Sequence, residues 1–445
     1  MPAGAQASKP TALDHSHLPR LGRDPAFWGL TVTQFLGAFN DNLFKQLLLL
    51  LAIPVGAAAA KKDDEQWYAM MAFSLPFILF SGVAGYLSDR YSKRTVIVLS
   101  KVAEIVVMLL GMAAFMSYGA TGYTGLLIVL FLMGAQSAFF GPGKYGILPE
   151  LFRGSDLPRA NGIILMTTFL AIIFGTASAG VLGVFFVDQD AAGKVDATRM
   201  WLGSLACVAI AVVGTLTCLP VRHTPRAEPN LNFQPSSLWV PPDMRRLLAQ
   251  DRALLLALGV SCMFWLISGV AMSAVNSLGK VQLGLNDLFT SILTAVIGLG
   301  IAVGAVLAGR MCHGRADFRA TKIGAWGILA CLSLLAIYLP GGQHLLGFGG
   351  SLVVLALLGV SAGMFAIPIQ VFLQARPPEK QKGRMIGVMN LVNFIAIFMA
   401  APLYKLFDII VTSAELPRSL IFAMTALLIV PVALFYRPKN VELDT

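Results

Sequence analysis

An apolar stretch near the N-terminus, residues 27–55, contains polar side chains of types that bind charged groups. The polar residues of its run AFNDNLFKQLLLLL are Asn40, Asp41, Asn42, Lys45 and Gln46. On a helix, Gln34, Asp41 and Lys45 would lie within about 40° of one another, as one polar stripe. An ion at the centre of a bilayer costs ~2.5–3.5 kcal/mol, so an ion there is expected to have a function. The stripe is a candidate binding site; the alternative is a buried i,i+4 pair that only pins the helix to its neighbours.

Further ionisable residues lie in other apolar stretches of the first half of the chain. Lys101 and Glu104 are one helical turn apart. In the run FFGPGKYGILPE, residues 141–143 are expected to break a helix just before Lys144 and Tyr145. A broken helix exposes backbone groups beside a cavity, where Lys144 could hold an anion. The alternative for Lys144 is a lysine that extends to the membrane interface.

The second half of the chain carries amides and hydroxyls in its apolar stretches, where the first half carries ions. The residues that would share a helix face are Ser273, Asn276, Ser277 and Lys280, then Gln370 and Gln374, and then Asn390 and Asn393. Hydrogen bonding between helices is the alternative explanation for them. The asymmetry predicts a substrate with a charged end and a large apolar remainder. The candidate substrate-binding residues are Gln34, Asn40, Asp41, Lys45, Lys101, Glu104, Lys144, Tyr145 and Asn276.

The composition indicates a membrane protein with many spans. Of the 445 residues, 57% are hydrophobic and only 13% are charged, and the mean hydropathy is +0.75. Soluble domains carry about twice that share of charged residues. About 20 apolar residues span a bilayer, and they do so as a helix because backbone groups in lipid must bond within the segment. The predicted spans are 27–55, 66–87, 95–117, 122–148, 158–186, 199–221, 253–279, 288–309, 321–340, 347–373, 385–408 and 417–436.

A basic, Pro-rich connection divides these twelve transmembrane helices into two halves of six. The predicted parts are a tail at 1–26, a helical bundle at 27–221, the connection at 222–252, a second bundle at 253–436 and a tail at 437–445. The halves echo each other, with GYLSDRYSKR after the second span and GAVLAGRMCHGR after the eighth. Two pseudo-symmetric halves are a common plan for transporters. Lys and Arg gather in the connections after even-numbered spans, which predicts that both termini are cytoplasmic.

The composition argues against several other classes of protein. The net charge of +10 lies in the loops between spans, and no basic patch with interleaved aromatic residues suggests nucleic-acid binding. The five cysteines include no CxxC pair and the five histidines do not cluster, so we expect no metal and no other cofactor. No stretch suits a soluble catalytic domain, so we expect no enzyme activity. The architecture is compatible with a monomer.

The segment GYLSDRYSKR resembles the loop 2–3 signature of the major facilitator superfamily, G-x-L-[AS]-D-R-x-x-[RK]-[RK]. Its matching residues are Gly85, Asp89, Arg90, Lys93 and Arg94. Gly85 allows close approach of helices, and Asp89 can accept hydrogen bonds from a helix N-terminus. The resemblance implies that Asp89 meets the start of span 11, near Gly383 and Arg384, as a latch that closes in one conformation only. The alternative is a plain basic turn.

Longer segments resemble the lysophospholipid transporter family within this superfamily. They are TQFLGAFNDNLFKQ, LSDRYSKRTVIVLSKVAEIVVMLLG, FFGPGKYGILPELF, ANGIILMTTFLAIIFGTASAG and QVFLQARPPEKQKGRMIGVMN. The resemblance, over about residues 27–436, implies a flippase of the bacterial inner membrane that moves lysophosphatidylethanolamine and similar lipids to the cytoplasmic leaflet. It implies that Asp41 meets a head-group amine or pairs with a cation. Lys45, Lys101 or Lys144 would meet the phosphate.

The sequence also departs from this family. Its transporter unit occurs elsewhere fused to acyltransferase domains, which this sequence lacks, so a separate acyltransferase is a candidate partner besides membrane lipids. The dedicated transporters place a basic residue within span 7; residues 265–275 contain none, and Lys280 is the nearest substitute. A second hypothesis is a proton-coupled transporter of a small solute or drug, with Asp41 or Glu104 as proton carrier. A third is a receptor or scaffold that does not transport.

Overall fold

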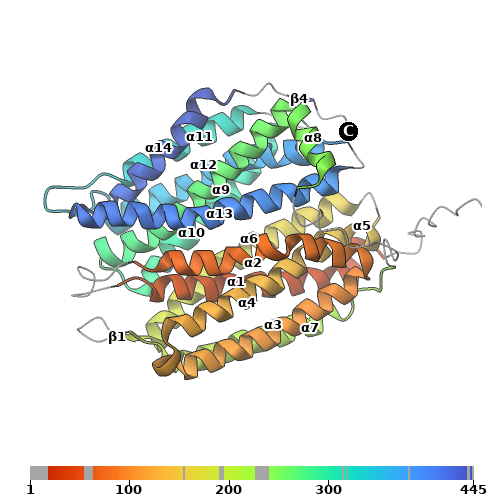
Figure 1. The fold of residues 1–445 in the computed structure, drawn as a ribbon, viewed down its shortest axis with the longest axis horizontal. Helices are drawn as coiled ribbons and strands as arrows, with labels where there is room; N and C mark the ends of the chain where they lie inside the picture. Colours follow the sequence, from red (N-terminus) through yellow and green to blue (C-terminus); the bar gives the residue numbers. More distant parts are fainter. Residues whose placement is uncertain are drawn as a thin grey trace, which may run out of the picture.

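Helices form nearly all of the described structure, and most of them run along the long axis of the molecule (Figure 1). The computed structural model describes residues 19–54, 64–153, 156–189, 195–225, 240–312, 315–316, 318–378, 381–437 and 441–442. The first half comprises α1 (Pro25–Leu51), α2 (Gln66–Arg90), α3 (Lys93–Met116), α4 (Tyr118–Gly146), α5 (Leu148–Leu151), α6 (Leu157–Phe186) and α7 (Trp201–Cys218).

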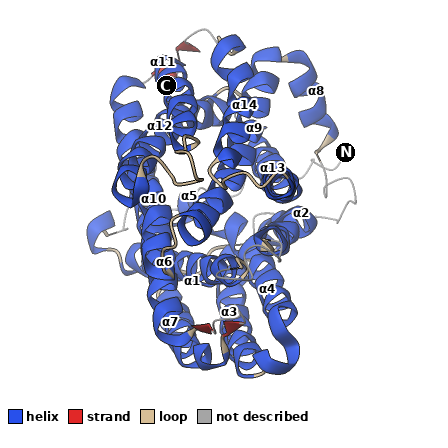
Figure 2. Ribbon diagram, turned by 90° about the vertical axis from the view of Figure 1, so that its left-hand side faces the viewer, coloured by secondary structure: helices blue, strands red, loops and turns tan. Residues whose placement is uncertain are grey.

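The second half follows the short connecting helix α8 (Pro242–Gln250). It comprises α9 (Arg252–Ser277) with a π-helical end at Leu278–Gln282, α10 (Asp287–Cys312), α11 (Phe318–Leu335), α12 (Gly347–Ala375), α13 (Lys382–Ser413) and α14 (Leu420–Phe435). Two short antiparallel pairs join β1 (Asp188–Gln189) to β2 (Val195–Asp196) and β3 (Arg315–Ala316) to β4 (Val441–Glu442). Figure 2 shows the halves as two adjoining groups of helices.

The predicted all-α membrane fold is confirmed. Within the described residues, ten helices are long and apolar enough to cross a membrane by length and composition. The helix α14 is apolar but has 16 residues, and α1 carries the polar stripe. With α1 and α14, the long helices correspond in order to the twelve predicted spans.

One local prediction about α4 is wrong. Residues 141–143 do not break the helix, because α4 continues through Pro142 to Gly146. A proline removes one backbone donor, but packing against neighbouring helices sustains such a helix in a membrane. Here a Cβ atom at Gly143 would lie 3.2 Å from Ile97 of α3, so the two helices are in close contact. The kink of α4 occurs instead at Gly122, whose φ of 58° favours glycine.

Small residues allow the helices of the second half to pack closely. The axes of α10 and α12 come so near that a Cβ atom at Gly304 would lie 2.0 Å from the carbonyl oxygen of Val360. A Cβ atom at Gly359 would lie 2.2 Å from the carbonyl oxygen of Ile297. Such contacts replace the hydrophobic effect as the cause of helix association in lipid.

The long helices run between two opposite ends of the bundle. We call the end at which α1 begins and α2 ends the proximal end, and the opposite one the distal end. In Figure 1 the proximal end, with α5 and α8, is on the right, and the distal end, with β1, is on the left. The halves meet mainly through α2 with α13 and α6 with α10.

Candidate substrate site between the two halves

Asp41 lies on a partly exposed face of α1, beside α4. The hydroxyl of Ser137 donates to Asp41 Oδ2 at 2.5 Å, and Gln136 Nε2 lies 3.5 Å from Asp41 Oδ1. Both partners are neutral, so neither contact pairs the Asp41 carboxyl with a cation. The polar pair Gln136–Ser137 within an apolar span is the sequence signal for this contact, but neither residue was among the predicted site residues.

Lys45 lies one turn further along α1, and its contacts differ from those expected. Its Nζ donates to Asn42 Oδ1 at 3.1 Å and lies 5.1 Å from the ring centroid of Phe73 in α2. Lys45 therefore contacts an amide and an aromatic face, whereas Asp41 contacts α4. Both residues are partly exposed, so the carboxyl and the ammonium lie as separate polar groups on one face of α1.

Aromatic side chains lie next to these charges. Phe73 is 5.5 Å from Phe77, and Phe77 stacks on Phe394 of α13 with ring centroids 3.9 Å apart. This stack joins the two halves near the middle of α2. A recess of about 180 Å³ empty volume lies between α9 and α12 and is lined by Ser261, Phe264, Trp265, Ala366, Ile369 and Gln370. The recess thus combines aromatic and aliphatic side chains with the polar groups of Ser261 and Gln370.

Gln34 and Lys144 meet through α6. Gln34 Nε2 donates to Thr167 Oγ1 at 2.7 Å, and Thr168 Oγ1 donates to Gln34 Oε1 at 2.8 Å. Lys144 Nζ lies 3.4 Å from Thr168 Oγ1. Gln34 is 1% exposed and Lys144 is 8% exposed. Tyr145 belongs to α4, but its side chain is outside the described part of the structure.

Asn40, Lys101 and Glu104 come together inside the first half, away from the exposed face of α1. Lys101 forms an ion pair with Glu104, and Asn40 Nδ2 donates to Glu104 Oε1 at 3.2 Å. All three residues are at most 1% exposed. A Cβ atom at Gly37 would lie 2.9 Å from Lys101 Nζ, so α1 leaves room for the ammonium. The cluster joins α1 and α3, and it is inaccessible in this conformation.

Asn276 lies in a buried polar network that joins the halves at the distal end. We call the network the distal seal; its side chains are Gln46, Asp64, Gln66, Asn276, Thr294 and Tyr404. Asn276 Oδ1 accepts from Gln46 at 2.8 Å and from Thr294 at 2.9 Å, and its Nδ2 donates to Gln66 at 3.0 Å. Every polar group of Asn276 is therefore engaged in holding the halves together.

Lys280 adds a second distal contact between the halves. Its Nζ donates to the carbonyl oxygen of Leu50 at 3.0 Å and pairs with Asp287 at 2.7 Å. Asp287 fits against Gly183 of α6, where a Cβ atom would lie 2.5 Å from its carboxylate. Lys280 therefore does not replace a basic residue in the middle of span 7, since it anchors the distal ends of α1, α6 and α10.

The predicted latch residues lie at the proximal end. Arg384 pairs with Asp243 of α8 at 2.6 Å, and Asp89 is exposed. In the described part of the chain, no atom of a neighbouring helix lies within 4 Å of a Cβ placed on Gly85, Gly383 or Gly387, so α2 and α13 are not in contact at these glycines. The hydrogen bonds described between the halves lie at the distal end. Within the described residues, this conformation is therefore closed at the distal end, and α2 and α13 are apart at the proximal end.

The basic residues of the latch contact the first half. Lys93 forms an ion pair with Glu150, and Arg94 donates from Nε to the carbonyl oxygen of Val221 at 2.6 Å. Arg90 donates to the hydroxyl of Tyr86. These contacts fix the turn between α2 and α3. Among the described residues, no group of His, Cys, Asp and Glu suits a metal ion.

Comparison with known proteins places the chain in a family. The model of the Major Facilitator Superfamily matches residues 30–401. The chain is 30% identical over 389 residues to the lysophospholipid transporter LplT of Enterobacter sp. (strain 638), covering 85% of this chain and 87% of the relative. It is 28% identical over 388 residues to LplT of Yersinia pestis (strain Pestoides F), covering 84% of each.

Solved structures of low sequence identity share the fold. A bacterial homologue of the human lysosomal transporter Spinster has a TM-score of 0.67 at 13% identity, covering 92% of this chain and 95% of that one. The xylose transporter XylE from E. coli has a TM-score of 0.65 at 14% identity, covering 94% and 97%. With the two helical halves and the family match, these observations show that the chain belongs to the lysophospholipid transporter family of the major facilitator superfamily.

Proposed function

We propose that this multi-pass membrane protein moves lysophospholipids across the bacterial inner membrane, toward the cytoplasmic leaflet, by alternating access. The relatives of similar length are named lysophospholipid transporters. The observation that carries the proposal is the partly exposed face of α1, where Asp41 and Lys45 present opposite charges beside aromatic rings. A zwitterionic head group with one acyl chain has the matching chemistry.

The head group is assigned to the first half and the acyl chain to the surface facing it. Asp41 would accept from the head-group amine, and Lys45 would meet the phosphate as a point charge. The aromatic stack and the aromatic and aliphatic side chains of the recess between α9 and α12 would contact the chain. Both termini, and hence the open proximal end, would face the cytoplasm, as the distribution of Lys and Arg predicts.

The test uses proteoliposomes with head-group-labelled lysophosphatidylethanolamine in the outer leaflet. An impermeant quencher reports how fast the lipid leaves that leaflet in wild type, in Asp41→Asn and in the control Asp188→Asn. Asp188 is an exposed carboxylate in a surface ion pair with Arg199, far from the site. We expect movement in wild type and control, and none in Asp41→Asn, because the amine loses its ionic partner.

Two outcomes would contradict the proposal. Equal movement in Asp41→Asn and wild type would remove Asp41 from the site. No movement above empty liposomes, with the protein shown to be folded, would mean a different substrate; strict dependence on a pH gradient with a water-soluble substrate would favour the proton-coupled alternative. The proposal also includes a separate acyltransferase that consumes the delivered lipid. It further includes that the protein acts as a monomer.

A further inference from the structure

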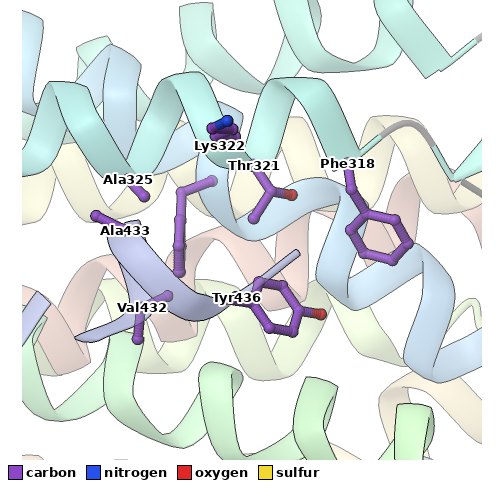
Figure 3. Close-up of a pocket in the computed structure, with 8 residues that line it drawn as sticks. Phe318, Thr321, Lys322, Ala325, Val432, Ala433 and Tyr436 are labelled. Carbon is purple, nitrogen blue, oxygen red and sulfur yellow. The ribbon is translucent and has the colours of Figure 1, made fainter. Parts of the chain in front are cut away.

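A small pocket lies between α11 and α14 in the second half, away from the transport site (Figure 3). Its empty volume, with the open space at its mouth included, is about 220 Å³, and its walls include Phe318, Thr321 and Lys322 of α11 and Tyr436, which directly follows α14. The pocket lies at the proximal end, because α11 begins there and α14 ends there. Figure 2 places α11 at the edge of the second half that is remote from the first half.

The polar atoms of the pocket point to a ligand. Thr321 is 2% exposed, and its hydroxyl has no hydrogen-bond partner among the described residues. Buried hydroxyls are normally hydrogen-bonded, so one without a partner in a pocket wall indicates a site for a ligand atom. Lys322 lies beside it as an exposed cation, and the exposed Arg437 follows Tyr436. The pocket therefore combines an unused donor with positive charge.

The surroundings of the pocket are apolar and exposed. Ile323 and Trp326 of α11 are 54% and 44% exposed, and Phe435 at the end of α14 is 80% exposed. In a membrane protein such side chains face lipid tails, whereas Lys322 and Arg437 belong to the head-group level. The pocket thus opens where the hydrocarbon meets the interface.

We propose that the phosphodiester head group of an anionic phospholipid in the proximal leaflet binds at the mouth of this pocket. Thr321 Oγ donates to a phosphate oxygen and the ammonium of Lys322 neutralises the phosphate charge. The acyl chains lie along the exposed apolar residues of α11 and α14. Basic pockets between membrane helices are known to select anionic head groups. The site is separate from the transport site and goes beyond the proposed function.

The test measures thermal unfolding of the full-length protein in detergent while phosphatidylglycerol is titrated. Phosphatidylcholine with the same acyl chains and free glycerol phosphate are titrated in parallel. We expect a saturable rise in Tm with phosphatidylglycerol only. The variants Lys322→Gln and Thr321→Val should each need about fivefold more phosphatidylglycerol for the same rise in Tm. This is the change expected when a contact as strong as that of one basic residue with an anionic membrane surface is lost. Thr321→Val keeps the shape of the side chain, so it is expected to fold.

The matched control is Arg159→Gln. Arg159 is an exposed cation at the proximal end of α6 in the first half, and it should leave the titration unchanged. If Arg159→Gln needed as much additional lipid as the pocket variants, the effect would come from general surface charge, and the proposed site would be wrong. Unchanged titrations in both pocket variants, or an equal response to phosphatidylcholine, would also overturn it. An equal response to glycerol phosphate would overturn the assignment to a lipid.

Discussion

Asn40 and Asp41 are neighbours in the sequence, yet their side chains contact different parts of the molecule. Successive residues on a helix are about 100° apart, so Asn40 faces the interior of the first half while Asp41 faces α4. The polar residues of α1 therefore have two roles. One part holds the first half together through Glu104, and the other remains partly exposed for a ligand.

At the residue scale, this division predicts different effects for two lysines of the first half. Lys101→Met leaves the buried Glu104 without its cation, and breaking such a pair costs about 3–5 kcal/mol of unfolding free energy. Lys45→Met removes a partly exposed cation, so it should lower lysolipid transport with little loss of stability. Thermal unfolding in detergent and the quenching assay measure the two effects.

The control for Lys101 is the double variant Lys101→Met with Glu104→Gln. It removes both charges and keeps an acceptor for Asn40, so it should recover most of the lost stability. If Lys101→Met were as stable as wild type but bound no lysolipid, Lys101 would be a ligand-binding residue, as the sequence predicted. The structure would then describe a conformation in which that residue is withdrawn.

At the scale of elements, the distal seal depends on a buried carboxyl in the loop before α2. Tyr404 donates to Asp64 Oδ2 at 2.6 Å, and the backbone N–H of Gln66 donates to Asp64 Oδ1 at 3.0 Å. Burial raises the pKa of Asp64 above its usual value of 3.8, although these donors and the nearby Arg418 act in the opposite direction. Tyr123 of α4 is a further titratable group that senses this carboxyl.

The raised pKa predicts a pH dependence of the seal. When the distal end opens, Asp64 meets water and its pKa returns toward the usual value, so the closed state binds the proton more tightly. This stabilisation is fully present below the usual value of 3.8 and is lost as the pH rises through the raised pKa. Lowering the pH from neutral should therefore increase the closed fraction.

Spin labels on the exposed distal residues Arg199 and Gln343, one in each half, would report this fraction as a distance distribution. Asp64→Asn cannot bind the proton, so its distribution should not change with pH in this range. A distribution that shifts equally in wild type and Asp64→Asn would assign the pH dependence to another group. A wild type that opens on acidification would reverse the predicted sign.

The same elements indicate how far the sequence can be interpreted. The twelve spans and the polar stripe were predictable, because the length of an apolar run and its interruptions are local properties. The contacts of Asn276 and Lys280 were not, since the sequence does not reveal the rotation of a helix or the conformation in which its halves meet. The continuous α4 shows that a local Pro-Gly signal can be overridden by packing against α3.

At the scale of the whole molecule, transport requires a second conformation in which the distal seal opens and the proximal ends of α2 and α13 meet. We propose that Gly85 and Gly387 leave space for this approach, since a Cβ atom on either has no neighbour within 4 Å in the present state. Gly387→Val should therefore fold and bind lysolipid from the proximal side, but should not transport it. Gly119→Val at the distal end of α4, which also meets open space, is the control and should transport normally.

Asp89→Asn tests the same closure through charge. If Asp89 closes the latch on the start of α13, its loss removes from the second conformation a charge-assisted hydrogen bond worth about 1.5–3 kcal/mol. Turnover should then slow by about tenfold or more while binding in the proximally open state is unchanged. Binding to the purified variant and flipping in proteoliposomes separate the two effects. Loss of binding would mean that Asp89 acts in the present conformation. Unchanged turnover would mean that the turn only sets the orientation of the helices in the membrane.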